Sequence, residues 1–285
     1  SVAPITYQKA IPVFADIDDN WCLSVETIKK KITKKTKAIL VVDLYGNMPD
    51  MDDIQELADD NNILLIEDSA EALGSKYYNV RAGKFGVGSV HSFHRTKTLT
   101  TGEGGLLLLD DEELYSRAKF LRDHGRSSVN PYYVLEPAPK YMPSNLQAAL
   151  ALAQFDRIDE LVNRKRDILY SYKKNLAKFD FLSLNMDNDN IFNGAWATTM
   201  VMGKRTKILA SELMKKLEID GIPSRPFFYP MSSVPAYEKY LKNGKDINPN
   251  SYNISKRGIT LPSHYLITDS QLNYIADKII KNLKD

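Results

Sequence analysis

The sequence has little cysteine: Cys22 is the only one among 285 residues. A single thiol excludes an internal disulfide and a metal site built from several cysteines, and it is typical of proteins from a reducing compartment. Long hydrophobic runs are also missing, since runs such as residues 106–109 are far too short to span a bilayer. Because no charged and then apolar leader precedes a cleavage site, we expect a cytoplasmic protein without a membrane anchor.

A large excess of charge of either sign is missing as well. The chain has 38 basic and 36 acidic residues, a formal net charge of +2, which implies no general attraction to nucleic acid. Six lysines gather in residues 29–37, but Val25, Ile28 and Ile32 recur there at helical spacing. We therefore interpret these lysines as the solvated face of one helix; an anion-binding patch is the alternative.

Short apolar runs bounded by polar turns predict the first strands. Residues 11–14, 38–42 and 63–66 have this pattern, and a helix is expected after Asp50, between the second and third runs. A strand, a helix and a strand within so short a segment form a βαβ unit. This unit predicts an α/β fold with a parallel sheet and a right-handed crossover.

The remaining elements suggest two domains. A helix from Ser144 to about Leu176 would be ~45 Å long and could link them. We expect a large domain at residues 1–150 and a smaller α+β domain within residues 151–285. The other predicted elements are strands at residues 87–93 and 105–109, a helix over residues 110–124 that buries Leu114, Ala118 and Leu121 and ends at Gly125, and a final helix with a capping box at Thr268.

Residues 83–105, GKFGVGSVHSFHRTKTLTTGEGG, carry the clearest chemistry. Lys97 stands there among Ser, Thr and Gly with few acidic neighbours, as a reactive amine would. Glycine lets backbone N–H groups approach an anion closely. A lysine that can form an imine with an aldehyde, beside donors for a phosphate, is what pyridoxal phosphate requires. A solvated loop lysine is the alternative.

Acidic residues stand where two predicted strands end. Asp43 follows residues 38–42, and Glu67 and Asp68 follow residues 63–66. In open α/β sheets, ligands bind beyond the carboxyl ends of the strands. A carboxylate there could accept a hydrogen bond from the protonated pyridine nitrogen of the cofactor and keep its ring cationic. The alternative is that Asp68 only caps the following turn.

The segment GIPSRPFFYP, residues 221–230, combines proline stiffness with aromatic side chains. Arg225 and Tyr229 could bind a sugar or its phosphates there. Packing is the alternative interpretation. A dehydrogenase is disfavoured, because GKFGVG at residues 83–88 lacks the GxGxxG pattern.

Two long motifs resemble a known family. IEDSAEALGS at residues 66–75 and FGVGSVHSFHRTKTLTTGEGG at residues 85–105 resemble the DegT/DnrJ/EryC1/StrS nucleotide-sugar aminotransferases, as do NLQAALALAQ at residues 145–154 and the LPSH that ends at His264. The resemblance implies the pyridoxal-phosphate-dependent transferase fold type I, like aspartate aminotransferase. That fold has a mostly parallel central sheet and a smaller α+β C-terminal domain.

The resemblance also implies roles for residues at matching positions. Lys97 resembles the Schiff-base lysine and Asp68 the partner of the pyridine nitrogen. Ala70 resembles the residue packed on one face of the ring, and Glu71 a polar contact near the ring hydroxyl. Ser92 is similar to the serine that binds the cofactor phosphate.

Lys140 stands where many members of the family have an asparagine that reaches the phosphate from the neighbouring subunit. A lysine there, and the segment at residues 221–230, resemble the perosamine-synthase branch. The resemblance therefore implies a homodimer with shared active sites that aminates GDP-4-keto-6-deoxymannose to GDP-perosamine, with glutamate as the amino donor, for surface polysaccharide. Sugars linked to UDP or dTDP remain alternatives.

The family places a phosphate loop and a ring-stacking aromatic residue before the segment that resembles residues 10–18. The sequence begins after both, so we expect residues 1–150 to form the cofactor-binding domain without its N-terminal part. Two alternative functions follow. One is a non-catalytic homologue that binds nucleotide sugars or regulates a partner. The other is a sugar dehydratase of the same fold, in which histidine takes the place of Lys97.

Overall fold

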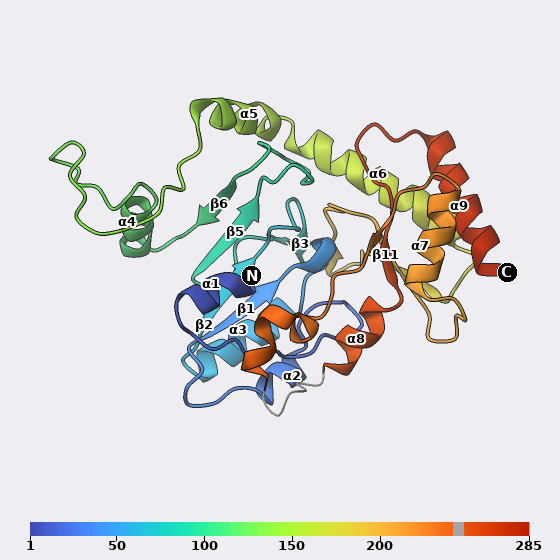
Figure 1. The fold of residues 1–285 in the computed structure, drawn as a ribbon, viewed down its shortest axis with the longest axis horizontal. Helices are drawn as coiled ribbons and strands as arrows, with labels where there is room; N and C mark the ends of the chain where they lie inside the picture. The colour runs from blue at the N-terminus through green and yellow to red at the C-terminus, as the bar shows by residue number, and fades with distance from the viewer. Residues whose placement is uncertain (242–247, 285) are drawn as a thin grey trace.

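The computed structural model describes residues 1–241 and 248–284. Two four-stranded sheets form its framework, one in each half of the chain (Figure 1). The long helix α6 (Ile158–Leu176) leads from the first half of the chain to the second. No helix in the described part of the chain combines the length and the apolar character needed to cross a membrane.

The first sheet has the order β1-β2-β5-β6. Strands β1, β2 and β5 are parallel, while β6 runs antiparallel to β5. The predicted βαβ unit is confirmed: α3 (Met51–Asp60) connects β1 to β2 and buries Ile54 and Ala58 completely. Because parallel strands share one carboxyl edge, the loops after β1, β2 and β5 meet there. The strands are β1 (Ala38–Val42), β2 (Leu64–Asp68), β5 (Gly88–Ser92) and β6 (Gly105–Leu108).

The second sheet is antiparallel, with the order β10-β11-β9-β7. Helices α6, α7 (Ala210–Ile219) and α9 (Asp269–Lys284) pack around one apolar cluster with it. The predicted capping box is confirmed, because Thr268 and Gln271 exchange hydrogen bonds at the start of α9. Its strands are β7 (Leu182–Leu184), β9 (Thr199–Met202), β10 (Arg225–Pro226) and β11 (Gly258–Thr260).

Shorter elements complete the described chain. They are α1 (Val2–Tyr7), α2 (Val25–Lys29), η1 (Leu44–Gly46), β3 (Lys76–Tyr77), β4 (Val80–Arg81), β8 (Ile191–Phe192), η2 (Met231–Ser233), η3 (Pro235–Tyr240) and α8 (Pro249–Ser255). Helix α2 ends at Lys29, so the prediction that one helix carries all six lysines of residues 29–37 is wrong. Ile28 is nevertheless buried, and the turn after α2 keeps Ile32 against the same core.

Two predicted elements are wrong in outline. Residues 11–14 form no strand, and Ile11 is 72% exposed, because no described strand pairs with this segment. The helix expected over residues 144–176 is divided into α5 (Asn145–Phe155) and α6. The break comes at Arg157, whose backbone is not helical and whose guanidinium binds Glu160 in the first turn of α6. The predicted start of the helix at Ser144 is confirmed, and Ser144 forms a capping box there with Gln147.

Helix α4 (Glu112–Leu121) lies at the base of a segment that projects away from the first sheet (Figure 1). The prediction that α4 buries an apolar face is wrong within the described chain, because none of its residues is buried and Leu114 is exposed. It also ends earlier than predicted. Arg122 is its C-cap, and Gly125 lies beyond the helix with a left-handed backbone.

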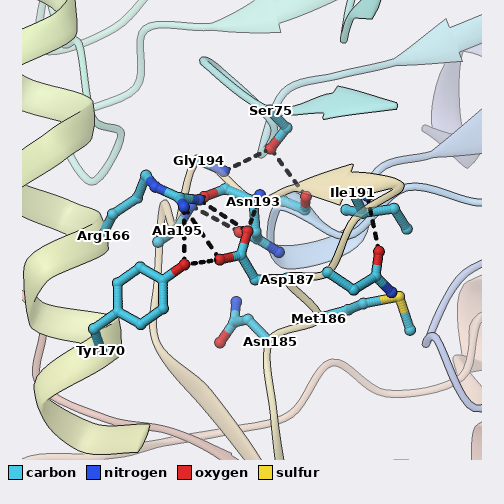
Figure 2. Close-up of polar contacts among 12 residues, drawn as sticks. Ser75, Arg166, Tyr170, Asn185, Met186, Asp187, Ile191, Asn193, Gly194 and Ala195 are labelled. Carbon is cyan, nitrogen blue, oxygen red and sulfur yellow. Dashed lines mark hydrogen bonds and ion pairs between the residues drawn. The ribbon is translucent and has the colours of Figure 1, made fainter. Parts of the chain in front are cut away.

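A buried polar network holds the loop between β7 and β9 to the rest of the molecule. Figure 2 shows Arg166 and Tyr170 of α6 meeting Asp187, and Arg166 binds both carboxylate oxygens at 3.0 and 3.1 Å. Asp187 in turn accepts the backbone N–H of Asn193 at 2.9 Å. Because both ends of this ion pair are nearly buried, the loop is fixed to α6.

Asn185 joins the two halves of the chain more directly. Its side-chain amide donates to the carbonyl oxygens of Tyr45 and Ala197, at 2.8 and 3.0 Å. Its oxygen accepts the backbone N–H of Thr199 at 2.7 Å. The side chain is fully buried, so its bonds replace those that water would make.

Replacing Asn185→Ala should lower the free energy of unfolding by about 2 to 4 kcal/mol, because three buried backbone groups lose their partner. Denaturant titration measures this change. The exposed residue Asn273, on α9, provides the control, since Asn273→Ala should change stability by no more than about 0.5 kcal/mol. Equal stability of the two variants would contradict the account.

Candidate functional site

The carboxyl edge of the first sheet brings Lys97 and the end of β2 together. Asp68 is the last residue of β2, and Lys97 lies in the loop from β5 to β6. Gln154 of α5 fixes this loop, because its side chain both accepts the N–H of Thr100, at 3.1 Å, and donates to the carbonyl of Thr100, at 2.6 Å. The loop that carries the amine is therefore held at its ends by β5 and β6 and at Thr100 by Gln154.

The Lys97 amine is enclosed rather than solvated. Its side chain is 11% exposed, and Nζ lies 3.5 Å from Glu71 Oε1. The other oxygen of Glu71 accepts the backbone N–H of Tyr45 at 3.0 Å. On another side, Nζ lies 3.7 Å from the centre of the Trp196 ring. The interpretation of Lys97 as a solvated loop residue is therefore wrong.

The surroundings change the proton affinity of both charged groups. Burial lowers the pKa of the Lys97 amine, and the charges of Glu71 and Asp68 oppose this shift without cancelling it. Burial raises the pKa of Glu71, opposed mainly by Lys97. An amine of lowered pKa gives up its proton more readily, as a nucleophile or a general base must.

The three acidic residues at the strand ends have different surroundings. Glu67 is buried and accepts the backbone N–H groups of Gly83 and Phe85, at 2.8 and 3.0 Å. Asp43 is fully buried, and burial together with the charge of Glu67 raises its pKa well above the usual range. Asp68 alone of the three lies close enough to Lys97 to affect the pKa of the amine.

The carboxylate of Asp68 is held on both sides. Oδ1 accepts the backbone N–H of Ala70 at 3.2 Å, which is the turn-capping contact expected as the alternative role. Oδ2 accepts the hydroxyl of Ser1 at 2.5 Å. The cap therefore uses Oδ1, and a ligand that binds Oδ2 would take the place of the Ser1 hydroxyl.

Of the other predicted site residues, some contact Lys97 and others have different partners. Glu71 contacts Lys97 directly, and Ser92 lies at the end of β5, where its Oγ accepts the backbone N–H of His94 at 3.2 Å. Lys140 lies in the projecting segment and pairs with Asp123 at 3.7 Å. Within the described chain, Lys140 contacts Asp123 and not Lys97.

Arg225 and Tyr229 are exposed at the edge of the second sheet, on and after β10. Between them, Phe227 is buried and Phe228 stacks on Tyr45, with ring centres 5.3 Å apart. The segment is thus attached to the residue that holds Glu71. Packing accounts for the two phenylalanines, while the side chains of Arg225 and Tyr229 are exposed.

Sequence reasoning missed Tyr45 and Trp196. Tyr45 is buried with a left-handed backbone, φ 56°, an uncommon conformation for a bulky residue that concentrates at functional sites. The available signal was its position, three residues after the end of the β1 run and directly before Gly46. Trp196 gave a weaker signal as one of two tryptophans in the chain.

The chain is similar to known proteins in both sequence and fold. The model of the DegT/DnrJ/EryC1/StrS aminotransferase family matches residues 1–280. A GDP-perosamine synthase of Escherichia coli O157:H7 is 38% identical over 281 residues, 98% of this chain and 75% of the relative. Another, of Vibrio cholerae, is 36% identical over 283 residues, 99% of this chain and 76% of the relative. A solved structure of a putative sugar aminotransferase from Streptococcus pneumoniae, in its PLP form, superposes with a TM-score of 0.92 at 26% identity, over 100% of this chain and 78% of that one.

The ion pair predicts how Lys97 reacts. Glu71→Gln keeps an oxygen for the N–H of Tyr45 but removes the charge, so the pKa of Lys97 should fall further and more of the amine should be neutral at pH 7. Acetylation of the cofactor-free chain by acetic anhydride, followed by peptide mass spectrometry over a pH series, measures this. The Lys97 rate at pH 7, as a fraction of its high-pH plateau, should rise several-fold.

Glu103→Gln is the control, since this carboxylate is exposed and lies beside His94, at 3.7 Å, rather than beside Lys97. It should leave the Lys97 profile unchanged. A Glu71→Gln profile that matches the wild type would mean that the ion pair does not set the charge of the amine.

Proposed function

Because the chain belongs to the DegT/DnrJ/EryC1/StrS aminotransferase family, we propose that it transfers the amino group of glutamate to a nucleotide-linked 4-keto-6-deoxyhexose. The protein is an aminotransferase that depends on pyridoxal phosphate. GDP-4-keto-6-deoxymannose is the proposed acceptor and GDP-perosamine the proposed product, supported by the names of the two synthases. The observation that carries the proposal is the enclosed Lys97 amine beside the Glu71 carboxylate, with a pKa that the charge of Asp68 also affects.

The residues of the site fit the cofactor. Lys97 supplies a primary amine for its aldehyde, Asp68 a carboxylate for its ring nitrogen, and Ser92 a hydroxyl for its phosphate. Ala70 and Glu71 stand beside Asp68 and would border the ring. When bound, pyridoxal phosphate supplies an electron sink for the bonds that break at the substrate carbon.

The chain's own contribution is proton handling at Lys97 Nζ. Burial favours the neutral amine, which can accept a proton, and Glu71 at 3.5 Å stabilises the ammonium that results. The Asp68 carboxylate can accept a hydrogen bond from a protonated ring nitrogen and so favour the cationic ring. Because burial favours the neutral amine and Glu71 stabilises the ammonium, one lysine can take up a proton at one position and deliver it at another.

We propose that Arg225 and Tyr229 contact the nucleotide sugar. Both are exposed and lie on a segment that Phe227 and Phe228 anchor to Tyr45. The guanidinium can bind phosphate oxygens in pairs, while the phenol can donate to a sugar hydroxyl.

We also propose a homodimer with shared sites. Helix α5 and the segment after α4 expose large apolar side chains, including Leu146 at 81% and Tyr132 at 88%. Exposed large apolar side chains in such number favour a protein interface, and a two-fold dimer is the commonest closed arrangement. Lys140 lies in the same projecting segment, so it would reach the cofactor phosphate of the partner.

Two further assignments belong to the same proposal. We propose that residues 1–150 form the cofactor-binding domain and residues 151–285 the interdomain helix and small domain; the strands of the first sheet lie in the former and those of the second sheet in the latter. A cytoplasmic location is proposed because the lone Cys22 is a free, buried thiol, which suits a reducing compartment.

Lys97→Ala should reduce amine transfer at least ~10³-fold, because both the attachment point and the proton carrier are lost. Release of 2-oxoglutarate from glutamate, with GDP-4-keto-6-deoxymannose as acceptor, measures this and separates transamination from dehydration. Lys84→Ala, at an exposed lysine paired with Asp110, should retain wild-type turnover. Turnover that survives Lys97→Ala would refute the proposal.

Leu146→Asp should convert the dimer to a monomer, because a charge at this position cannot be buried against a partner. Light scattering after gel filtration gives the mass. The monomer should also bind pyridoxal phosphate more weakly, since Lys140 no longer reaches a second site. Ile219→Asp, at an apolar residue of α7 that is 87% exposed, should remain dimeric. A dimeric Leu146→Asp protein would place the interface elsewhere.

A further inference from the structure

Trp196 contacts the Lys97 loop at two points. Its indole Nε1–H donates to the carbonyl oxygen of Thr96 at 2.7 Å. The face of its ring lies 3.7 Å from Lys97 Nζ, well within the range of a cation–π interaction. One side chain therefore holds both the backbone that carries the lysine and the amine at its end.

The same tryptophan closes a ring of contacts with Glu71. Trp196 stacks on Tyr45, with ring centres 6.0 Å apart and planes 9° from parallel. Tyr45 donates its backbone N–H to Glu71, and Glu71 binds Lys97. The amine thus lies between a carboxylate and an aromatic face, and the two are joined to each other through Tyr45.

The polar network of Figure 2 fixes the backbone next to Tyr45 and the backbone that precedes Trp196. Ser75 Oγ donates to the carbonyl of Gly46, next to Tyr45, and accepts the N–H of Gly194, at 2.9 Å each. Ala195 then takes a left-handed backbone, φ 52°, and its N–H donates to Asn193 Oδ1 at 2.7 Å. The backbone before Trp196 has little freedom, so the indole of Trp196 is directed at the Lys97 loop.

We infer that Trp196 is a positioning residue for Lys97: its Nε1–H holds the backbone at Thr96, and its ring face holds the protonated amine opposite Glu71 between uptake and delivery of a proton. The need for such a holder rests on the proposed function, in which Lys97 is protonated between two transfers. The contact itself is a property of the chain without its cofactor.

The physical basis is the balance of two effects on the amine. An apolar cover dehydrates Nζ and favours the neutral form, whereas an aromatic face and a carboxylate favour the ammonium. Glu71 and Asp68 are the charged groups that act on Nζ. Trp196 supplies both the apolar cover over Nζ and the aromatic face. A substitution that keeps an apolar side chain but removes the aromatic face therefore isolates the stabilisation of the ammonium.

The test compares acetylation profiles of Lys97 in the full, cofactor-free chain, with acetic anhydride as the probe. Trp196→Leu keeps an apolar cover without a ring face. The Lys97 rate at pH 7, as a fraction of its high-pH plateau, should rise about two- to fivefold, because the ammonium loses its aromatic partner. Trp196→Phe keeps a ring face and should stay within about twofold of the wild type.

Trp21→Leu is the matched control. Trp21 is buried in the same aromatic cluster, edge-on to Tyr45 and Phe227, but its recorded ring contacts are with those two residues rather than with Lys97. It should destabilise the fold, as measured by thermal unfolding, and leave the Lys97 profile unchanged. A merely structural role for Trp196 predicts the same pattern for both tryptophans.

Three outcomes overturn the inference: an unchanged profile in Trp196→Leu, a shift toward the ammonium form, or an equal shift in Trp21→Leu. Release of 2-oxoglutarate by the wild type tests the proposed function separately. A chain that fails to transfer the amine but shows the expected profiles loses the proposed function while the Trp196 contact stands.

Discussion

The structure depends on keeping a lysine amine out of water beside the carboxylate of Glu71 and within the electrostatic influence of Asp68. Lys97 sits at the carboxyl edge of a sheet, where burial weakens its hold on a proton and Glu71 partly restores it. An enclosed amine is costly unless its partners are fixed, and here each partner is itself bonded: Glu71 to Tyr45 and Asp68 to Ala70. An amine in this balance can both take up and give up a proton.

The second half of the chain completes the site rather than standing apart from it. Asn185 reaches Tyr45, and Trp196 reaches the Lys97 loop. The buried network around Asp187 fixes the loop from which both contacts come. Local stability and reactivity are therefore coupled, since loosening this loop would release the aromatic face and the carboxylate from the amine together.

Much of this was predictable from sequence, within clear limits. The βαβ unit and the strand before Lys97 were predicted correctly because apolar period and capping are local signals. The predicted strand at residues 11–14 was wrong because a strand needs a pairing partner, which the local pattern does not show. The predicted burial of Leu114 was wrong because the apolar face of α4 is left uncovered within the described chain. Lys97 and Glu71 stand in the two neighbouring motifs that resemble the family, but Trp196 is about a hundred residues away, and only the fold brings it to the amine.

The most direct test of the central claim is to find where pyridoxal phosphate attaches. The full chain is incubated with the cofactor, reduced with borohydride and digested, and its peptides are weighed by mass spectrometry. The account predicts one adduct for each chain, on the peptide that contains Lys97. Adducts spread over exposed lysines, with the Lys97 peptide unmodified, would contradict it.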